Sequence, residues 1–302
     1  MTGTSAFLVV GGDSLVGKGV IDALERRGRP AFATTRRRET TGGKRIYLDF
    51  ESEEPFRVPT GVGHAFLIAA ATNYERCESD PQANVINAKL IPRVVASLLE
   101  QNTSVTFVST NSVFGGDRAW PNEDDPHAPR IAYARQKSEG EAAVTAAAER
   151  IGASQRLNIV RLTKIMNATV PPIPAWLTAW GRGEPIQPFA DLIFAPISVK
   201  FVGEALATIG ETLVAGNLHL SGADNVSYVD FANMLAEQLG VSADLIRPTT
   251  ATEKGVHIAF KPRFSGLAMT RTTHLTTIKP QTLNALVADL VADIKGWPED
   301  FR

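Results

Sequence analysis

The chain has 302 residues, 44% of them hydrophobic and 21% charged, and its formal net charge at pH 7 is -1. These values are ordinary for a globular protein, and the lack of a large basic field argues against nucleic acid or an anionic membrane as a partner. The single cysteine, Cys77, excludes an intrachain disulfide, and the first residues lack the basic and apolar segments of a signal peptide, so we expect a cytoplasmic location.

The first half of the chain alternates short apolar runs with longer amphipathic segments. Residues 6–10 (AFLVV) predict a buried strand, and apolar residues at helical spacing over 16–27 predict the helix after it. Further strands are predicted at 30–35, 45–50, 64–71, 104–110 and 157–162, and further helices at 84–100 and 133–150. This alternation predicts an α/β fold with a Rossmann-type doubly wound parallel sheet.

The alternation stops after Asn167, where the segment VPPIPAW is rich in proline. Proline inside a helix removes a backbone hydrogen bond, so a single long helix is not expected there. Later segments predict helices at 199–213, 227–239 and 280–294 and a strand at 218–222. We therefore expect a Rossmann domain over 1–166, to which the chain returns around 195–215, and a mainly smaller substrate-binding region over 167–302.

A glycine-rich turn, GGDSLVG, joins the first predicted strand to the first helix. Glycines let backbone N–H groups approach a pyrophosphate, and the helix N-terminus offers a favourable field for the anion. Gly11 and Gly17 stand at the required positions, but Ser14 replaces the usual middle glycine, so an ordinary strand-to-helix turn is the alternative. The residues expected to contact a dinucleotide here are Gly11, Gly12, Ser14, Leu15, Val16 and Gly17.

The second predicted strand ends in TTRRR, residues 34–38. An NAD site usually has Asp or Glu at this point to bind the ribose 2′-hydroxyl, and the run contains neither. Guanidinium groups suit the 2′-phosphate of NADPH instead, because they form charge-assisted hydrogen bonds with it. We therefore predict NADP(H) as the cofactor, with Arg36 as the first candidate ligand and Arg37 beside it; a solvated basic loop is the alternative.

Tyr133 and Lys137 stand four residues apart on a predicted helix, so their side chains share one face. The preceding strand ends in Thr110, and open α/β sheets bind ligands at the carboxyl ends of their strands. A free tyrosine, with a pKa of about 10, is poorly matched to neutral pH. The positive charge of a nearby lysine, with that of the oxidised nicotinamide, favours the phenolate and lowers this pKa. Tyr133 could then give a proton to a carbonyl that takes a hydride, while Thr110 orients that carbonyl.

Six segments carry a family resemblance. They are VVGGDSLVG, VSTNSVFGG, YARQKSEGE, GNLHLSGADNVSYVDFA, AAATNYERCESDPQANVINA and KPRFSGLAMT. Together they resemble an extended short-chain dehydrogenase/reductase, and most closely the dTDP-4-dehydrorhamnose reductase group, over nearly the whole chain. The resemblance implies an NADPH-dependent reductase of a nucleotide-linked 4-keto sugar. In it, Tyr133 is the general acid, Lys137 holds the nicotinamide ribose and Thr110 is the hydroxyl partner.

The resemblance also implies cofactor contacts away from the glycine turn and the arginines. It places Asp49 near the adenine, lines the cofactor with residues 69–72, and makes Asn87 a buried polar residue that helps to place the catalytic strand. The residues expected here are Asp49, Phe50, Ala69, Ala70, Ala71, Thr72, Asn87, Tyr133 and Lys137. A homodimer is the assembly expected at the level of the family.

Departures from the group concern the substrate. Asn111 and Ser112 replace the aspartate and tyrosine that usually follow the threonine, and Lys164 replaces a tryptophan near Arg161. Because Thr110 is not followed by an acidic pair, a 4,6-dehydratase is disfavoured. The expected substrate-binding residues are Thr110, Asn111, Ser112, Lys164, Lys261 and Arg263, and a solvated loop is an equal alternative for the last two.

Two other functions stay open. A nucleotide-sugar 4-epimerase would need the same three catalytic residues, but it normally keeps NAD bound, which fits the arginine run less well. A non-catalytic regulatory protein that binds the cofactor would have no need of an acidified tyrosine, although the altered substrate positions keep this alternative open.

Other polar and aromatic residues are better explained without a ligand. No metal site is expected, because the five histidines show no metal-ligand spacing. His64 is expected at a surface or sheet edge, and residues 123–125 in a solvent-facing acidic loop that could approach the sugar. Trp176 and Trp180 stand one helical turn apart, so packing is expected, and covering a sugar or nucleobase is the alternative.

Overall fold

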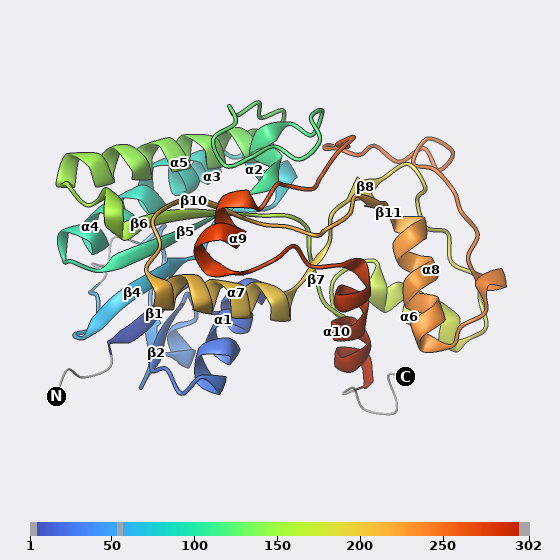
Figure 1. Cartoon of the computed structure of the whole chain (residues 1–302), viewed down its shortest axis with the longest axis horizontal. Coiled ribbons are helices and arrows are strands. Elements are labelled where there is room, and N and C mark those ends of the chain that lie inside the picture. The colour runs from blue at the N-terminus through green and yellow to red at the C-terminus, as the bar shows by residue number, and fades with distance from the viewer. Residues whose placement is uncertain (1–4, 53–56, 296–302) are drawn as a thin grey trace.

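A parallel β-sheet forms the centre of the computed structural model, which describes residues 5–52 and 57–295 (Figure 1). Its seven strands follow the order β10-β6-β5-β4-β1-β2-β3, and all neighbouring pairs are parallel. Their bounds are β1 Ala6–Val10, β2 Ala31–Thr35, β3 Arg45–Tyr47, β4 Val62–Leu67, β5 Ser104–Thr110, β6 Leu157–Leu162 and β10 Gly216–Leu220. The strand order reverses beside β1, so its carboxyl end lies at the point where such sheets bind ligands.

Helices cover both faces of this sheet (Figure 1). One face carries α4 (Ile91–Glu100) and α5 (Ala132–Ile151), and the other carries α1 (Leu15–Arg26) and α7 (Val199–Thr212). Val95 of α4 shares a buried cluster with Leu8 of β1, whereas Leu206 of α7 shares another with Val9. Neighbouring residues of β1 therefore point into opposite cores, as the predicted doubly wound sheet requires.

The helix predicted at 84–100 begins earlier, at Pro81. Its first turn is α3 (Pro81–Asn84), where proline at the first position suits a helix start and the Asp80 carboxylate accepts the Gln82 N–H at 2.9 Å. A π-helical segment, η2 (Val85–Leu90), joins α3 to α4 and contains Asn87, which is buried. The helix therefore carries an irregular turn at a buried polar residue.

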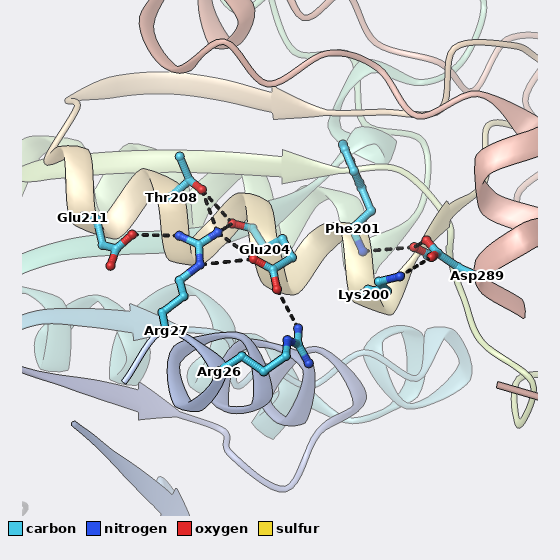
Figure 2. Close-up of polar contacts among 9 residues, drawn as sticks. Arg26, Arg27, Lys200, Phe201, Glu204, Thr208, Glu211 and Asp289 are labelled. Atoms are coloured by element: carbon cyan, nitrogen blue, oxygen red, sulfur yellow. Dashed lines mark hydrogen bonds and ion pairs between the residues drawn. The ribbon is translucent and has the colours of Figure 1, made fainter. Parts of the chain in front are cut away.

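Helix α7 packs against α1 through two glycines and a group of ion pairs. A Cβ atom on Gly203 would lie 2.2 Å from the carbonyl oxygen of Gly19, so only glycine allows the two backbones to come this close. Beside the contact, the Arg27 guanidinium pairs with Glu204 at 2.6 Å and with Glu211 at 2.7 Å (Figure 2). These contacts hold the returning part of the chain against the first βα unit.

A smaller region lies at the carboxyl ends of the strands (Figure 1). Its elements are α6 (Ile173–Gly181), α8 (Tyr228–Leu239), α10 (Leu283–Lys295), β7 (Ile165–Met166), β8 (Ile193–Phe194), β9 (Ile197–Ser198) and β11 (Val226–Ser227). Trp176 and Trp180 are buried with Phe231 in its core, and their ring centroids lie 6.1 Å apart, which confirms that they pack together. Lys200 of α7 pairs with Asp289 of α10 at 2.9 Å and links this region to the sheet (Figure 2).

The structure differs from the element predictions mainly at strand ends and in one buried residue. β3 ends at Tyr47, and β4 spans Val62–Leu67 instead of 64–71. The return of the chain to the Rossmann domain was predicted around 195–215. It extends further, to Leu220, because β10 is the last strand at one edge of the sheet. The division of the chain at residue 167 stays a prediction.

The expectation that His64 lies at a surface or edge is wrong. β4 pairs with both β1 and β5, so His64 is covered from both sides and is 3% exposed. Its Nε2 lies 2.8 Å from the Thr106 hydroxyl, and burial lowers its pKa to about 3, so the imidazole is neutral. The apolar residues that follow His64 correctly predict a strand. They do not indicate that this strand lies inside the sheet, between two others.

The remaining helical elements are short. They are α2 (Tyr74–Ser79), α9 (Thr270–Thr276) and the 3-10 turns η1 (Arg38–Thr40), η3 (Asn111–Phe114), η4 (Ser154–Arg156) and η5 (Ala243–Leu245). Within the described ranges, no helix combines the length and the apolar character that crossing a bilayer requires.

Candidate active site

The turn after β1 brings backbone amides together at the N-terminus of α1. Gly11 has a φ of +95°, and a Cβ atom there would lie 2.7 Å from the Ala69 nitrogen. A Cβ atom on Gly17 would lie 2.2 Å from the Gly11 carbonyl oxygen, so both positions require glycine. Ser14 accepts the Gly17 N–H at 3.0 Å and caps the helix. A close-packed turn of this kind fits the pyrophosphate of a dinucleotide.

The end of β2 carries a polar network that the motifs did not reveal. The Thr34 hydroxyl accepts the Gly11 N–H at 2.9 Å, and the Thr35 hydroxyl donates to the Asp13 carboxylate at 2.6 Å. Asp13 also pairs with Arg45, the first residue of β3. Desolvation opposes ionisation, but the bonds from Thr35 and Arg45 hold the pKa of Asp13 below its ordinary value. The acidic residue inside the glycine turn, Asp13, was the feature of the sequence that could have indicated this network.

The predicted adenosine-binding residues lie around this network. Arg36 and Arg37 are exposed just after β2, and the Arg37 backbone N–H donates to the Thr35 hydroxyl at 3.0 Å. Asp49 accepts the backbone N–H of Glu51 at 3.0 Å. Phe50 packs against the buried cluster between the sheet and the helices α4 and α5. The contacts of these residues with a cofactor stay predictions.

Asn87 links the segment after β4 to helix α5. Its amide makes two bonds with the backbone of Ala71, each 2.9 Å long, and donates to the Gln136 side chain at 2.9 Å. Asn87 therefore holds residues 69–72 in place. Its hydrogen-bond partners lie after β4 and on α5, so the expectation that it helps to place the catalytic strand stays a prediction.

A cavity of about 790 Å³ lies between the carboxyl ends of the strands and the smaller region. This volume is in the range typical of small-molecule sites. The predicted residues that line it are Val16, Ala70, Thr72, Thr110, Asn111, Tyr133, Lys137, Lys164 and Lys261. The predicted residues outside its lining are Gly11, Gly12, Ser14, Leu15, Gly17, Arg36, Arg37, Asp49, Phe50, Ala69, Ala71, Asn87, Ser112 and Arg263.

Thr110, Tyr133 and Lys137 meet at this cavity from β5 and α5. The Thr110 hydroxyl is close enough to the Tyr133 phenol to act against the rise of its pKa. The Lys137 ammonium donates to the Val108 carbonyl at 2.8 Å and lies 4.1 Å from the centre of the Phe107 ring. The structure therefore brings the three predicted residues together, with the lysine bonded to the strand backbone.

Burial controls the protonation of the tyrosine and the lysine. Desolvation raises the pKa of Tyr133 above its ordinary value, and the neighbouring Tyr74 and Cys77 add to this effect. Desolvation also lowers the pKa of Lys137 to about 8, against the opposing effect of Glu141. The expectation that the lysine and the oxidised nicotinamide together lower the tyrosine pKa concerns the complex with the cofactor and stays a prediction; in the chain by itself, burial has the larger effect. The phenol is protonated at neutral pH, as a proton donor must be.

The predicted substrate residues fall into two groups. Asn111 lines the cavity and donates to the Ser265 carbonyl at 2.8 Å, which ties the end of β5 to the C-terminal segment. Lys261 also lines it and pairs with Asp191 at 2.5 Å. Lys164 lines it without a side-chain partner among the described residues; partial desolvation lowers its pKa although it keeps contact with solvent.

Two predicted substrate residues lie apart from the cavity. Ser112 is 1% exposed, and its hydroxyl lies 3.1 Å from that of Thr110 inside the turn η3. Arg263 is exposed, and its guanidinium carbon lies 5.1 Å from the centre of the Phe264 ring. Their contact with a substrate stays a prediction that the cavity does not support.

Aromatic residues that the motifs did not single out complete the cavity wall. The ring of Tyr74 lies 5.4 Å from that of Tyr133, and Tyr228 stacks on Phe194 at 4.3 Å. Three of the four tyrosines of the chain therefore line the cavity. Tyr74 and Tyr228 lie within two of the segments that carry the family resemblance, and this position was the feature that could have indicated a place at the cavity.

The acidic loop before α5 differs from its prediction. Glu123 is buried and accepts the Arg271 backbone N–H at 3.0 Å, so only Asp124 and part of Asp125 meet solvent. None of the three lines the cavity. In the part of the chain that the structure describes, no group of three or more His, Cys, Asp or Glu side chains is placed to hold a metal ion.

Comparison with known proteins gives a family match and two named relatives. The family described as the RmlD substrate binding domain matches residues 5–295. The chain is 28% identical over 187 residues to a probable dTDP-4,6-dihydroxy-2-methyloxan-3-one 4-ketoreductase of Streptomyces antibioticus, a match that covers 60% of this chain and 61% of that protein. It is 23% identical over 257 residues to the probable low-salt glycan biosynthesis reductase Agl14 of Haloferax volcanii, covering 81% and 84% of the two chains.

Solved structures share the fold over nearly the whole chain. A dTDP-4-dehydrorhamnose reductase from Bacillus anthracis in complex with NADP has a TM-score of 0.78 at 18% identity, and the match covers 96% of this chain and 99% of that one. MoeE5 in complex with UDP-glucose and NAD has a TM-score of 0.78 at 20% identity, covering 96% and 98%. At these identities the likeness concerns the fold.

Proposed function

We propose a function from the premise that this chain belongs to the RmlD substrate binding domain family, a family of NAD(P)-dependent reductases of the extended short-chain type. The proposed reaction is the NADPH-dependent reduction of a 4-keto group on a nucleotide-linked sugar. The observation that carries it is the meeting of Thr110, Tyr133 and Lys137 at a cavity that also includes Val16 of the first helix.

The three residues have separate roles in this proposal. When bound, NADPH supplies the hydride for the carbonyl carbon. Tyr133 donates its phenolic proton to the carbonyl oxygen as negative charge develops there. Thr110 holds the same oxygen with its hydroxyl, and the charge of Lys137 stabilises the phenolate that remains. In the chain by itself, burial keeps the Tyr133 phenol protonated, so the proton that the reaction uses is present, and its release depends on the positive charge of Lys137 and of the oxidised cofactor.

The proposed cofactor is NADPH. Arg36 and Arg37 are exposed where β2 ends, and guanidinium groups there favour a 2′-phosphate. The relative from Bacillus anthracis is described with NADP, and MoeE5 is described with NAD. Membership of the family therefore does not distinguish NADPH from NADH, and it is the arginines of this chain that favour NADPH.

The proposed substrate class follows from the cavity and the relatives. The Streptomyces antibioticus relative is named as a 4-ketoreductase of a dTDP-linked sugar. Asn111 and Ser112 follow Thr110 and carry no carboxylate, which disfavours the elimination of water by a dehydratase. Lys164 and Lys261 supply positive charge that suits the diphosphate of a nucleotide sugar.

The proposal is tested by NADPH oxidation with a panel of dTDP- and UDP-linked 4-keto sugars, with NADH in parallel. We expect turnover of one sugar, and a loss of at least about 100-fold in kcat for Tyr133→Phe. Tyr47→Phe is the matched control, because Tyr47 lies on β3 outside the cavity lining. Unchanged turnover in Tyr133→Phe would contradict the assigned role.

Two other outcomes would favour the alternatives. Tight NADPH binding without turnover of any sugar would favour a regulatory protein. Inversion at C4 of a nucleotide sugar without net NADPH oxidation would favour an epimerase, because an epimerase returns the hydride to the sugar that supplied it. Product analysis by NMR distinguishes these outcomes from reduction.

A further inference from the structure

The Asp13–Arg45 pair lies between segments that hold the adenosine half of a dinucleotide in this fold. Asp13 belongs to the glycine turn, and its carboxylate accepts the hydroxyl of Thr35, the last residue of β2, at 2.6 Å. Its other oxygen pairs with the Arg45 guanidinium from β3. The carboxyl end of β2 is where Rossmann folds recognise the ribose 2′-substituent, so the pair lies at the position that distinguishes NAD from NADP.

The pair is charged, accessible and incompletely satisfied. The side chains of Arg45 and Asp13 are 40% and 28% exposed, so a ligand can reach them. The Nε of Arg45 is shielded from solvent and has no acceptor among the described residues. Arg37 is close enough for its charge to act on Asp13. One carboxylate and one guanidinium group therefore share this region, and the charge of a second arginine acts on the carboxylate.

We propose that Asp13 and Arg45 set the preference of this chain between NADPH and NADH, and that they act in opposite directions. Arg45 offers its guanidinium to the 2′-phosphate of NADPH. Asp13 repels that phosphate, because it carries charge of the same sign, and it competes for Arg45. The preference for NADPH is therefore smaller than the exposed arginine run by itself would give.

This inference rests on the proposed dinucleotide site and is independent of the sugar. A pair with a purely structural role would act through the shape of the glycine turn. Its loss would then change the binding of every adenosine nucleotide alike, because all of them use that turn. A role in specificity instead predicts changes that depend on the 2′-phosphate.

The test is calorimetric titration of the full chain with adenosine 2′,5′-bisphosphate and with 5′-AMP, which differ only in the 2′-phosphate. Asp13→Asn should tighten the bisphosphate Kd roughly three- to tenfold and change the AMP Kd less than about twofold. Arg45→Gln should weaken the bisphosphate by a similar factor, and Arg45→Lys should recover part of the loss. Arg26→Gln, which alters an exposed arginine paired with Glu204, is the matched control.

Either Asp13→Asn or Arg45→Gln alone can distinguish a role in specificity from a structural role. Thermal unfolding of each variant shows whether it folds. Equal changes for the two nucleotides, or a weaker bisphosphate Kd in Asp13→Asn, would overturn the inference. Failure of both nucleotides to bind the unaltered chain would overturn it together with the proposed cofactor site. If the nucleotides behave as expected but no sugar is reduced, the inference stands and the proposed reaction fails.

Discussion

The Lys137 ammonium and the Val108 carbonyl oxygen are joined by a hydrogen bond of 2.8 Å. Lys137 lies one turn after Tyr133 on α5, and Val108 lies two residues before Thr110 on β5. The bond therefore joins the helix to the strand near Tyr133 and Thr110, which both line the cavity. Lys137 is only 3% exposed, so its charge is kept at this point against the penalty of desolvation.

The buried lysine should make stability depend on pH in a defined direction. The pKa of Lys137 is about 8 in the folded chain and 10.5 ordinarily, so the unfolded chain binds more protons between these values. The free energy of unfolding should therefore rise by about 2 kcal/mol from pH 7 to pH 9.5 through this group. Urea unfolding of Lys137→Met should lack this rise. The same pH dependence in both chains would contradict the buried charge.

The Thr110 hydroxyl should matter for the chemical step more than for substrate binding. It lines the cavity with Tyr133 and accepts the Ser112 backbone N–H at 3.2 Å. Thr110→Val should lower kcat about 100-fold with little change in KM, because the hydroxyl supports charge that develops on the carbonyl oxygen. Thr110→Ser keeps the hydroxyl and should retain most of the activity. Equal losses in the two variants would show that packing of the methyl group dominates.

Two ion pairs should differ sharply in their effect on stability. Arg161 and Glu141 form a pair at 2.7 Å whose side chains are 3% and 4% exposed, whereas the Arg26–Glu204 pair is 54% and 38% exposed. Arg161→Met should lower the free energy of unfolding by about 3–5 kcal/mol, because it removes the guanidinium from the buried Glu141 carboxylate and leaves it only the His127 imidazole, at 3.4 Å, as an ion-pair partner among the described residues. Arg26→Met should change it by less than about 1 kcal/mol. Similar losses in urea unfolding would contradict this difference in burial.

The contact between α1 and α7 should be sensitive to a single methyl group. A Cβ atom on Gly203 would lie 2.2 Å from the Gly19 carbonyl oxygen, so Gly203→Ala should destabilise the chain by about 1–3 kcal/mol. Gly181→Ala is the matched control, because a Cβ atom on Gly181, at the end of α6, would meet no described neighbour within 4 Å. The control should be neutral or slightly stabilising. Thermal unfolding of both variants checks the prediction, and a stable Gly203→Ala chain would contradict it.

Local patterns predicted the elements that depend on nearby residues. The strands predicted at 157–162 and 104–110 agree with β6 and β5, because each is a short segment with apolar and β-branched residues at its centre. The capping role of Ser227 is also confirmed, since Ser227 and Asp230 form a reciprocal capping box. His64 shows the limit of such patterns. Its burial depends on strands on either side of β4, which the residues around it do not specify.

The sequence by itself determined the doubly wound parallel sheet and the identity of three candidate catalytic residues, because helical and strand spacing and the glycine turn are local properties. Only the tertiary structure decided the environment of those residues. Desolvation raises the tyrosine pKa, and the lysine bonds to a strand carbonyl, since both outcomes depend on packing between α5 and β5. The contact of Asp13 with Arg45 likewise arises from parallel pairing of β2 with β3, which brings distant residues beside the glycine turn.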